Sequence, residues 1–353
     1  MPLTTRFGIE EEFVLVDAHA LVPVSASELH SQVLGAFPGG GRLTSEFLTS
    51  QIESATAPLG TLAEAGEQLS GMRGMLADCA PGGGLIASTG APYALAGAAQ
   101  VMATPHYDEV AELFGRLSLE HVVNGLHVHV HVVGDEERVR AMRRVREWLP
   151  VLLALSVNSP FAQGRHSGFA SWRSIMIRRL PASWCPPAFH DAEDYHDALN
   201  RLMGIGLLPS RSSVSWAVRL SERYETVEVR VADAQLRVQD TLLITALTRA
   251  IVCASDLPES VPQDGELDAS MWLAARHGMR AHLFRPDGST EPAWRAVERM
   301  LAGIRGVLDE LGDAAYVDEQ LARLRSEGTG ADRQVRAHDA GGVPALAGLF
   351  RDW

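Results

Sequence analysis

Residues 7–16 form a run of apolar positions interrupted by three consecutive acidic residues, Glu10, Glu11 and Glu12. The apolar flanks predict a β-strand. Successive side chains of a strand point to opposite faces, so Glu10 and Glu12 share one face and Glu11 lies on the other. Two like charges on one buried face require a cation between them, because they would otherwise bind protons. An edge strand with solvated glutamates explains the same pattern, and this stretch alone does not separate the two interpretations.

Residues 124–133 alternate strictly between polar and apolar side chains, which is typical of a strand with one buried face. His127, His129 and His131 share the polar face, and apolar residues, mostly valines, form the other. A lone histidine most often has a structural role, whereas three histidines at a period of two favour a site. We expect at most two of them to be functional.

Residues 216–221 and 226–233 predict a β-hairpin joined by a turn at 222–224. The second strand alternates valines with Glu228 and Arg230, so these two side chains share a polar face. An ion pair on a surface hairpin explains the pair equally well, and such a pair contributes little stability.

Apolar residues at helical spacing predict helices along most of the remaining chain. Asp135 precedes one of them as a candidate N-cap, and the arginines of that helix indicate a mostly solvated face. Residues 164–187 show no period and have the composition of a long functional loop. No repeat or low-complexity linker is found, so one domain over residues 1–353 is the simplest prediction. The predicted helices span residues 27–34, 61–80, 105–120, 136–155, 192–203 and 239–255, and a helical tail begins near residue 271.

The composition is that of a globular protein, with 46% hydrophobic residues. A formal net charge of −13 at pH 7, without any run of Lys or Arg, argues against partners such as nucleic acid or an anionic membrane. Three widely spaced cysteines, Cys79, Cys185 and Cys253, argue against a disulfide framework. The N-terminus lacks the pattern of a secretory signal, and no apolar run is long enough to span a membrane. We therefore expect a cytoplasmic protein.

Acidic residues also interrupt the apolar stretch 46–56, which holds Glu46 and Glu53. Four strand-like segments thus each present metal-competent groups, and one antiparallel sheet would direct them into a single concavity. Carboxylates with little imidazole and no thiolate favour Mg²⁺ or Mn²⁺ over Zn²⁺, and Mg²⁺ usually completes its shell with phosphate oxygens and water. Several such cations would hold a nucleoside triphosphate. The candidate groups are Glu10, Glu12, Glu46, Glu53, His127, His129, Glu228 and Arg230.

Seven ordered motifs resemble those of the type 2 glutamate-cysteine ligase family, whose members are also called carboxylate-amine ligases. Each motif alone is a weak signal, but their shared order and spacing form a strong one. The segment GADRQ at 330–334 resembles the ending of the family, so the resemblance covers nearly the whole chain. The motifs are GIEEEF (8–13), QIE (51–53), GLHVHV (125–130), NSPF (158–161), SWRS (171–174), WAVR (216–219) and TVEVRVAD (226–233).

The resemblance implies an α+β fold like that of glutamine synthetase, in which a curved antiparallel sheet forms an active-site funnel and helices pack outside. It also implies an ATP-dependent ligase that acts on two small molecules. The carboxylate of one substrate, glutamate or another amino acid, attacks the γ-phosphorus of ATP to give an acyl phosphate. The amine of the other, cysteine or another amine, then displaces phosphate. Cations and arginines supply the charge neutralisation that this chemistry requires.

The resemblance also assigns roles to individual residues. Glu11 is expected to face away from the site. Catalytic positions of the family match Arg173, Arg230 and Glu53. Positions that bind substrate or nucleotide match Arg173, Arg219, Arg230, His129 and Asn158. Positions that ligate Mg²⁺, or Mn²⁺ in its place, match Glu10, Glu12, Glu46, Glu53, His127 and Glu228.

Two departures from the family pattern fall near the expected substrate pocket. His131 stands where the family more often has glycine, and residues 181–187, which include Trp184 and Cys185, replace a shorter stretch. These departures concern the acid and the amine rather than ATP-dependent ligation itself. Exposed helices permit a homodimer.

Two other functions fit some of these residues. A metal-dependent hydrolase would use His127 and His129 to bind Zn²⁺ and water as the nucleophile, although the excess of carboxylates argues against it. A nucleotide-binding module without turnover would keep the same residues and the same fold.

Overall fold

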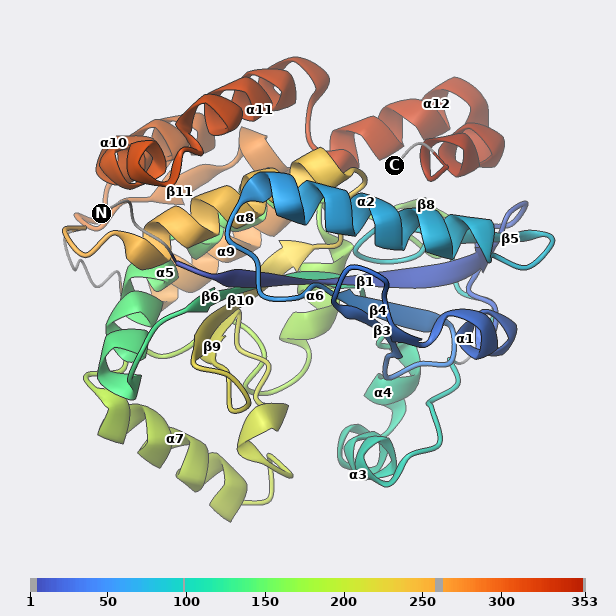
Figure 1. Cartoon of the computed structure of the whole chain (residues 1–353), viewed down its shortest axis with the longest axis horizontal. Coiled ribbons are helices and arrows are strands. Elements are labelled where there is room, and N and C mark those ends of the chain that lie inside the picture. Colours follow the sequence, from blue (N-terminus) through green and yellow to red (C-terminus); the bar gives the residue numbers. More distant parts are fainter. Residues whose placement is uncertain (1–4, 98, 258–262, 352–353) are drawn as a thin grey trace.

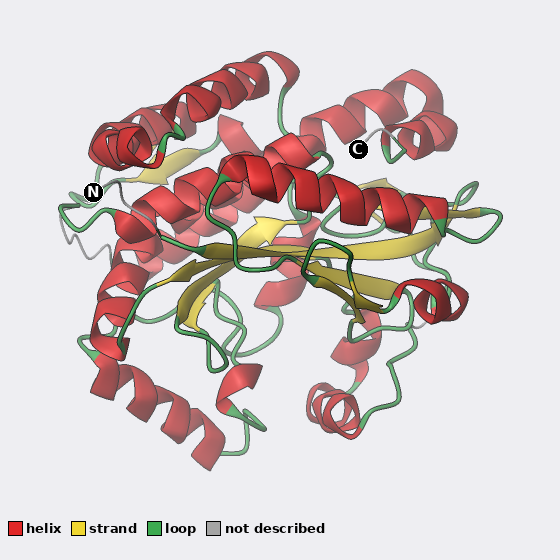
Figure 2. Ribbon diagram, in the orientation of Figure 1, coloured by secondary structure: helices red, strands yellow, loops and turns green. Residues whose placement is uncertain are grey.

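A twisted antiparallel sheet runs through the centre of the molecule, with helices on both of its faces (Figures 1 and 2). The computed structural model describes residues 5–97, 99–257 and 263–351. The strands of the sheet follow the order β2-β3-β4-β1-β6-β10-β9, and β5 also pairs with β1. The predicted α+β architecture built on an antiparallel sheet is therefore confirmed, and the sheet is open. The strands are β1 (Phe7–Asp17), β2 (Gly35–Ala36), β3 (Arg42–Ser45), β4 (Gln51–Ala55), β5 (Gly84–Ala87), β6 (Gly125–His131), β9 (Val218–Leu220) and β10 (Thr226–Asp233).

One face of the sheet carries the main hydrophobic core and most of the long helices (Figure 1). Helices α5 and α8 pack against each other and against the valine face of β6 and β10, and α10 and α11 cover α8. Nearly every residue of α8 is buried, as expected for a helix that is apolar on all sides. The helices of this layer are α2 (Leu62–Asp78), α5 (Asp135–Ser156), α8 (Val238–Cys253), α9 (Asp264–His277), α10 (Ala293–Leu311), α11 (Ala314–Glu327) and α12 (Gly330–Leu349).

The opposite face of the sheet is flanked by shorter helices and the segments that connect them (Figure 1). These are α3 (Pro105–Phe114), α4 (Arg116–Glu120), α6 (Trp172–Arg178) and α7 (Ala192–Gly204), followed by a short 3-10 turn at Arg211–Ser213. Helix α1 (Ser27–Val33) lies beside the β3–β4 end of the sheet. None of the helices in the described ranges combines the length and apolarity that a membrane crossing requires.

Strand β1 lies inside the sheet, between β4 and β6. The interpretation of this segment as a solvated edge strand is therefore wrong. In its second half both faces are apolar, because Phe13 and Leu15 belong to one buried cluster and Val14 and Val16 to another. Glu10, Glu11 and Glu12 come before this second half of the strand. In the first half, the hydrophobic core packs against only one face.

Three local predictions about helices are wrong. The segment 105–120 is not one helix, because Gly115 (φ 53°) separates α3 from α4. The predicted loop 164–187 contains α6, whose N-cap is Ser171. Asp135 lies in the first turn of α5, and the N-cap is Gly134.

Two predictions about polar residues are also corrected. The arginines of α5 do not form a solvated face, because Arg144 and Arg146 are buried. Their guanidinium groups donate hydrogen bonds to the carbonyl oxygens of Val252 (2.9 Å) and Pro186 (2.8 Å). The stretch 46–56 forms a strand only at β4, so Glu46 lies in the connection that follows β3.

Candidate active site

Strand register brings carboxylates and imidazoles together on the polar face of the sheet. Glu12 lies opposite Glu53 of β4, and Glu10 lies opposite His127 of β6. The Nδ1 atom of His127 lies 3.2 Å from Oε2 of Glu10, and its Nε2 atom lies 3.5 Å from Oε1 of Glu12. The backbone N–H of Gly125 donates a 2.5 Å hydrogen bond to Glu12. Carboxylates of the neighbouring strands β1 and β4 thus lie around the imidazole of His127 on β6.

The same row continues across β10 to β9. His129 lies opposite Glu228, and Glu228 lies opposite Arg219. Arg219 donates hydrogen bonds of 2.7 and 3.1 Å to Glu228, and Arg230 pairs with the same carboxylate. Burial raises the pKa of Glu228, but the charges of Arg230 and Arg219 outweigh burial and hold this pKa well below its usual range. Glu228 is only 1% exposed, so its pair with Arg230 is not the surface ion pair that the hairpin pattern also allowed.

His129 and His131 follow along β6 and have different surroundings. The Nδ1 atom of His129 lies 3.0 Å from the hydroxyl of Thr226, and its Nε2 atom lies 3.4 Å from Oε1 of Glu10. Burial opposes protonation of His129, but the hydrogen bond to Glu10 and the charge of Glu228 raise its pKa. His131 is exposed at the end of the strand and lies outside the cluster.

Glu46 and Glu53 are crowded against other carboxylates. Burial, followed by the negative charge of Glu12, raises the pKa of Glu46 to about 8. Burial, followed by the charge of Glu10, raises the pKa of Glu53 well above its usual range, although Thr44 donates a 3.1 Å hydrogen bond to it. A bound cation reverses shifts of this kind, because it stabilises the ionised carboxylates.

Two sets of three side chains among the described residues could hold a divalent cation. Glu10, His127 and Glu228 form one set, and Glu12, Glu53 and His127 form the other, with the ligand atoms of each set within 4.8 Å of one another. The Nε2 atom of His127 is buried without a hydrogen-bond partner in the described part of the chain, which a metal–nitrogen bond would satisfy. Each set offers two carboxylates and one imidazole. This set of donors suits Mg²⁺ or Mn²⁺ better than Zn²⁺, and it differs from the zinc site with two histidines that the hydrolase hypothesis required.

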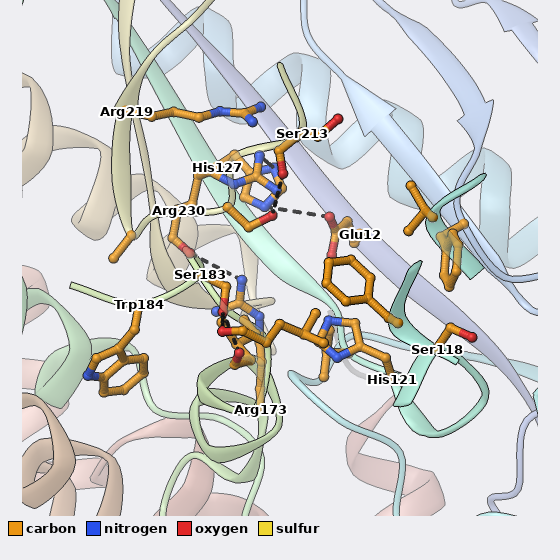
Figure 3. A pocket seen from close by; sticks show the side chains of 18 of the residues that line it. Glu12, Ser118, His121, His127, Arg173, Ser183, Trp184, Ser213, Arg219 and Arg230 are labelled. Carbon is orange, nitrogen blue, oxygen red and sulfur yellow. Dashed lines mark hydrogen bonds and ion pairs between the residues drawn. The ribbon is translucent and has the colours of Figure 1, made fainter. Parts of the chain in front are cut away.

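A cavity of about 280 Å³ adjoins one side of this row (Figure 3). Glu12, Glu46 and His127 line its inner end at the sheet, and Arg173 and Arg230 add positive charge there. The remaining walls come from α3, α4, α6 and the segments that follow α6 and α7. Of the set Glu12, Glu53 and His127, two residues line the cavity. Of the other set, only the shared His127 does.

Arg173 extends from α6 back to the sheet (Figure 3). Its side chain is buried, and its guanidinium donates hydrogen bonds to the carbonyl oxygens of Arg230 (3.1 Å) and Val231 (3.4 Å). Glycine is required at position 125 for this approach. A Cβ atom on Gly125 would lie 2.5 Å from Nη2 of Arg173 and 2.8 Å from Nε2 of His127.

Two residues with predicted binding roles make extensive internal contacts. In addition to its pair with Glu228, Arg219 donates hydrogen bonds of 2.6 Å to the carbonyl oxygens of Ser212 and Val214. It thereby fixes the segment after α7 to the sheet. Asn158 is fully buried and does not line the cavity, and its side-chain amide donates to two backbone carbonyl oxygens.

Sequence reasoning missed two groups that belong to this region. His121 lines the cavity, and burial together with the charges of Arg173 and Arg179 lowers its pKa to about 4, so the imidazole is neutral at pH 7. It lies between a helix and a strand, where no periodic pattern marks it. Asp233 accepts a 2.8 Å hydrogen bond from Ser171, the N-cap of α6. The sequence did offer one signal for Asp233, because it ends the predicted strand 226–233, which also carries Glu228 and Arg230.

The chain matches a sequence family and named relatives over nearly its whole length. The model of glutamate-cysteine ligase family 2 matches residues 6–347. A putative glutamate–cysteine ligase 2-1 of Saccharopolyspora erythraea is 37% identical over 339 residues, which cover 94% of this chain and 90% of that protein. A protein of the same name from Nocardia farcinica is 35% identical over 354 residues, which cover 97% and 92% of the two chains.

Solved structures with low sequence identity share the fold. The glutamate–cysteine ligase of Francisella tularensis in complex with AMP superimposes with a TM-score of 0.76 at 13% identity, covering 99% of this chain and 88% of that one. The bifunctional glutathione synthetase of Pasteurella multocida gives 0.71 at 17% identity, covering 99% and 52%. The protein described here thus belongs to glutamate-cysteine ligase family 2, a family of carboxylate-amine ligases, and shares its fold with the glutamate–cysteine ligase of Francisella tularensis.

Proposed function

We propose that this protein uses ATP to join the carboxylate of a small acid to the amine of a second small molecule through an acyl phosphate. The observation that supports this most directly is the pair of carboxylate–imidazole sets that share His127 beside a cationic cavity. A phosphoryl transfer needs little covalent help from a protein. It needs positioning and neutralisation of negative charge, which these residue types supply.

The acidic row is the proposed site for Mg²⁺, or Mn²⁺ in its place. A divalent cation bound there would neutralise phosphate oxygens and keep the carboxylates ionised. Burial and repulsion by neighbouring carboxylates raise the pKa values of Glu46 and Glu53, and this supports the role. The proposed ligands are Glu10, Glu12, Glu46, Glu53, His127 and Glu228.

The arginines have separate proposed roles. Arg230 and Arg173 lie at the inner end of the cavity, where their charges stabilise phosphate oxygens and the substrate carboxylate. Arg219 holds Glu228 in place, and His129 contacts Glu10 at the far side of the row. Asn158 acts from behind the cavity, by supporting the chain around Asp233 through a 2.8 Å hydrogen bond from its backbone N–H.

The proposed reaction has two steps. An oxygen of the acid attacks the γ-phosphorus of ATP, and ADP leaves. The amine nitrogen then attacks the acyl carbon, the bond between that carbon and the phosphate oxygen breaks, and the nitrogen releases a proton. We propose an amino acid such as glutamate as the acid, because the inner end of the cavity offers arginine side chains to a carboxylate.

Phosphate release tests the proposal. Purified protein with Mg²⁺ and ATP should release phosphate only when an acid and an amine are both present. Glu53→Gln and Glu228→Gln should each reduce the rate by about 10²-fold or more, because each removes a charge that holds a cation. Glu222→Gln, on the exposed turn between β9 and β10, is the matched control and should retain activity.

Three results would contradict the proposal. Full turnover by Glu53→Gln and Glu228→Gln would refute the site. Stoichiometric zinc with hydrolysis in the absence of ATP would favour a metal-dependent hydrolase. Binding of ATP without turnover across a broad panel of acids and amines would favour a nucleotide-binding module.

A further inference from the structure

The cavity beside the acidic row differs in chemistry between its two ends. Its outer wall is formed by six half-buried apolar side chains from elements off the sheet. Among the described residues that line the cavity, the charged ones are all close to the sheet. Most lie on its strands, Glu46 directly follows β3, and Arg173 extends from α6 to the sheet. The outer wall consists of Val110, Phe114, Ile177, Leu180, Trp184 and Leu207. The charged lining residues are Glu12, Glu46, Arg173, Arg219 and Arg230.

Arginines close to the outer wall in sequence are committed to other partners. Arg178 pairs with Asp268 at 2.5 Å, and Arg179 pairs with Glu120 at 2.8 Å. Trp184 lies at the margin of the cavity, across from Glu12 (Figure 3). As far as the structure describes the chain, the outer wall therefore offers apolar contact area but no arginine that is available to bind a carboxylate.

Two of the hydroxyl groups that line the cavity, those of Ser118 and Ser183, direct their protons to the backbone. Ser118 donates to the carbonyl oxygen of Gly115 at 2.7 Å, and Ser183 donates to the carbonyl oxygen of Leu180 at 2.5 Å. A serine whose proton is used in this way can only accept a hydrogen bond from a ligand. A carboxylate placed against these two serines would meet acceptors rather than donors. The buried indole N–H of Trp184 has no hydrogen-bond partner among the described residues and could donate one bond, but it carries no charge to balance a buried carboxylate.

The two steps of the proposed reaction indicate which substrate lies at which end of the cavity. The reacting carboxylate of the acid must reach the phosphate, so the acid occupies the inner end, where Arg173 and Arg230 lie. The amine nitrogen must reach the same acyl carbon, and the rest of the amine molecule then extends along the outer wall.

Building on the proposed ligase function, we propose that the second substrate is a primary amine with an uncharged, largely apolar body rather than an amino acid with a free carboxylate. Burial of an unpaired carboxylate against Leu180 and Phe114 is unfavourable, whereas burial of an aliphatic or aromatic group there is favourable. The outer wall thereby discriminates between amines that differ only by a carboxylate.

Matched pairs of amines test this inference. Cysteamine and cysteine differ only in the α-carboxylate, and so do phenethylamine and phenylalanine. With Mg²⁺, ATP and saturating glutamate, kcat/KM for phosphate release should be at least about tenfold higher for the amine that lacks the carboxylate in each pair. Equal or higher values for cysteine and phenylalanine would overturn the inference and leave the ligase function standing.

A charge placed in the outer wall should reverse the preference. Leu180→Arg introduces the missing cation, and Leu180→Met is the control with a similar volume. We expect Leu180→Arg to favour phenylalanine over phenethylamine and Leu180→Met to keep the original preference. Leu207→Arg provides a second test if Leu180→Arg does not fold, as judged by circular dichroism. An unchanged preference in a folded arginine variant would overturn the inference.

Equilibrium binding separates this inference from the proposed function. Calorimetry with Mg²⁺ and ADP present measures the affinity for phenethylamine and phenylalanine without any turnover. Tighter binding of phenethylamine that is lost in Leu180→Arg supports the inference even if no acid–amine pair releases phosphate, a result that would refute the ligase function alone. Equal binding of both compounds would overturn the inference.

Discussion

Three consecutive glutamates in β1 have different surroundings because neighbouring side chains of a strand alternate between faces. Glu10 and Glu12 contact His127 on the polar face. Glu11 points into the helical layer, where it pairs with Arg73 at 2.5 Å, and both side chains are at most 2% exposed. The expectation that Glu11 faces away from the site is confirmed. The pair holds β1 against α2 and has no part in the proposed chemistry.

Removal of the Glu11 charge should destabilise the protein without affecting the metal ligands. Glu11→Gln leaves Arg73 buried without its counter-ion, which should lower the free energy of unfolding by about 3–5 kcal/mol. Urea denaturation followed by circular dichroism measures this change. The double variant Glu11→Met with Arg73→Met removes both charges, so it should recover a large part of the loss. If Glu11→Gln unfolded at the same urea concentration as the wild-type protein, the pair would contribute little to stability.

Single residues also show what the sequence could not reveal. The two-residue period correctly placed Glu10, Glu12 and His127 on one face, because strand geometry is local. It gave no sign that Arg146 is buried, because partners that compensate its burial are distant in sequence: the carbonyl oxygen of Pro186 lies 40 residues away and the carboxylate of Asp264 lies 118 residues away. His121 was missed for the same reason, because only the fold brings it to the cavity.

At the scale of elements, α6 was the most important omission. It is a seven-residue helix, too short for a clear hydrophobic period, within a segment rich in Gly, Ser and Pro. Its start is set by tertiary contacts, since the Ser171 hydroxyl accepts a hydrogen bond from the backbone N–H of Ser174 and donates one to Asp233. The strands and most of the long helices were predictable, whereas elements specified by distant partners were not.

Ser171→Ala should reduce both stability and activity. The loss of the N-cap and of the bond to Asp233 should cost about 1–2 kcal/mol in the free energy of unfolding. Because α6 carries Arg173, kcat/KM should fall about tenfold or more as this guanidinium loses its position.

Asp191→Ala is the matched control for this prediction. Asp191 caps α7 through a 2.9 Å hydrogen bond from the backbone N–H of Asp194, and Asp191 does not line the cavity. Its replacement should cause a similar loss of stability with little change in kcat/KM. If both variants lost the same activity, the link between the α6 cap and Arg173 would be refuted.

At the scale of the whole molecule, the acidic row should make stability depend on cations and pH. The pKa of Glu46 is about 8 in the folded protein and near its ordinary value of 4.5 in the unfolded chain. The folded protein therefore binds a proton that the unfolded chain releases between these two values. The stability that this group contributes is full below pH 4.5 and is lost as the pH rises through about 8.

Magnesium should restore that stability most strongly at high pH, where protons no longer compete for the carboxylates. Thermal unfolding should show a rise in Tm of about 3 °C or more when Mg²⁺ is in large excess over its Kd, compared with EDTA. The rise should be larger at pH 8 than at pH 6. Sodium at matched ionic strength is the control, and Glu53→Gln should weaken the response. An equal effect of sodium would argue against a specific site.

The central position of β1 also sets the order in which the sheet can be completed. Among the strands of this sheet, β1 comes first in the chain, and its partners β4 and β5 follow by residue 87. Its other partner, β6, begins at Gly125, and β10, which covers the far edge of β6, begins only at Thr226. A nascent chain thus exposes an unpaired strand edge for about 100 residues of synthesis, at about 5–20 residues per second. Long-range pairing of this kind slows folding, so assembly of the sheet should be the step most sensitive to aggregation.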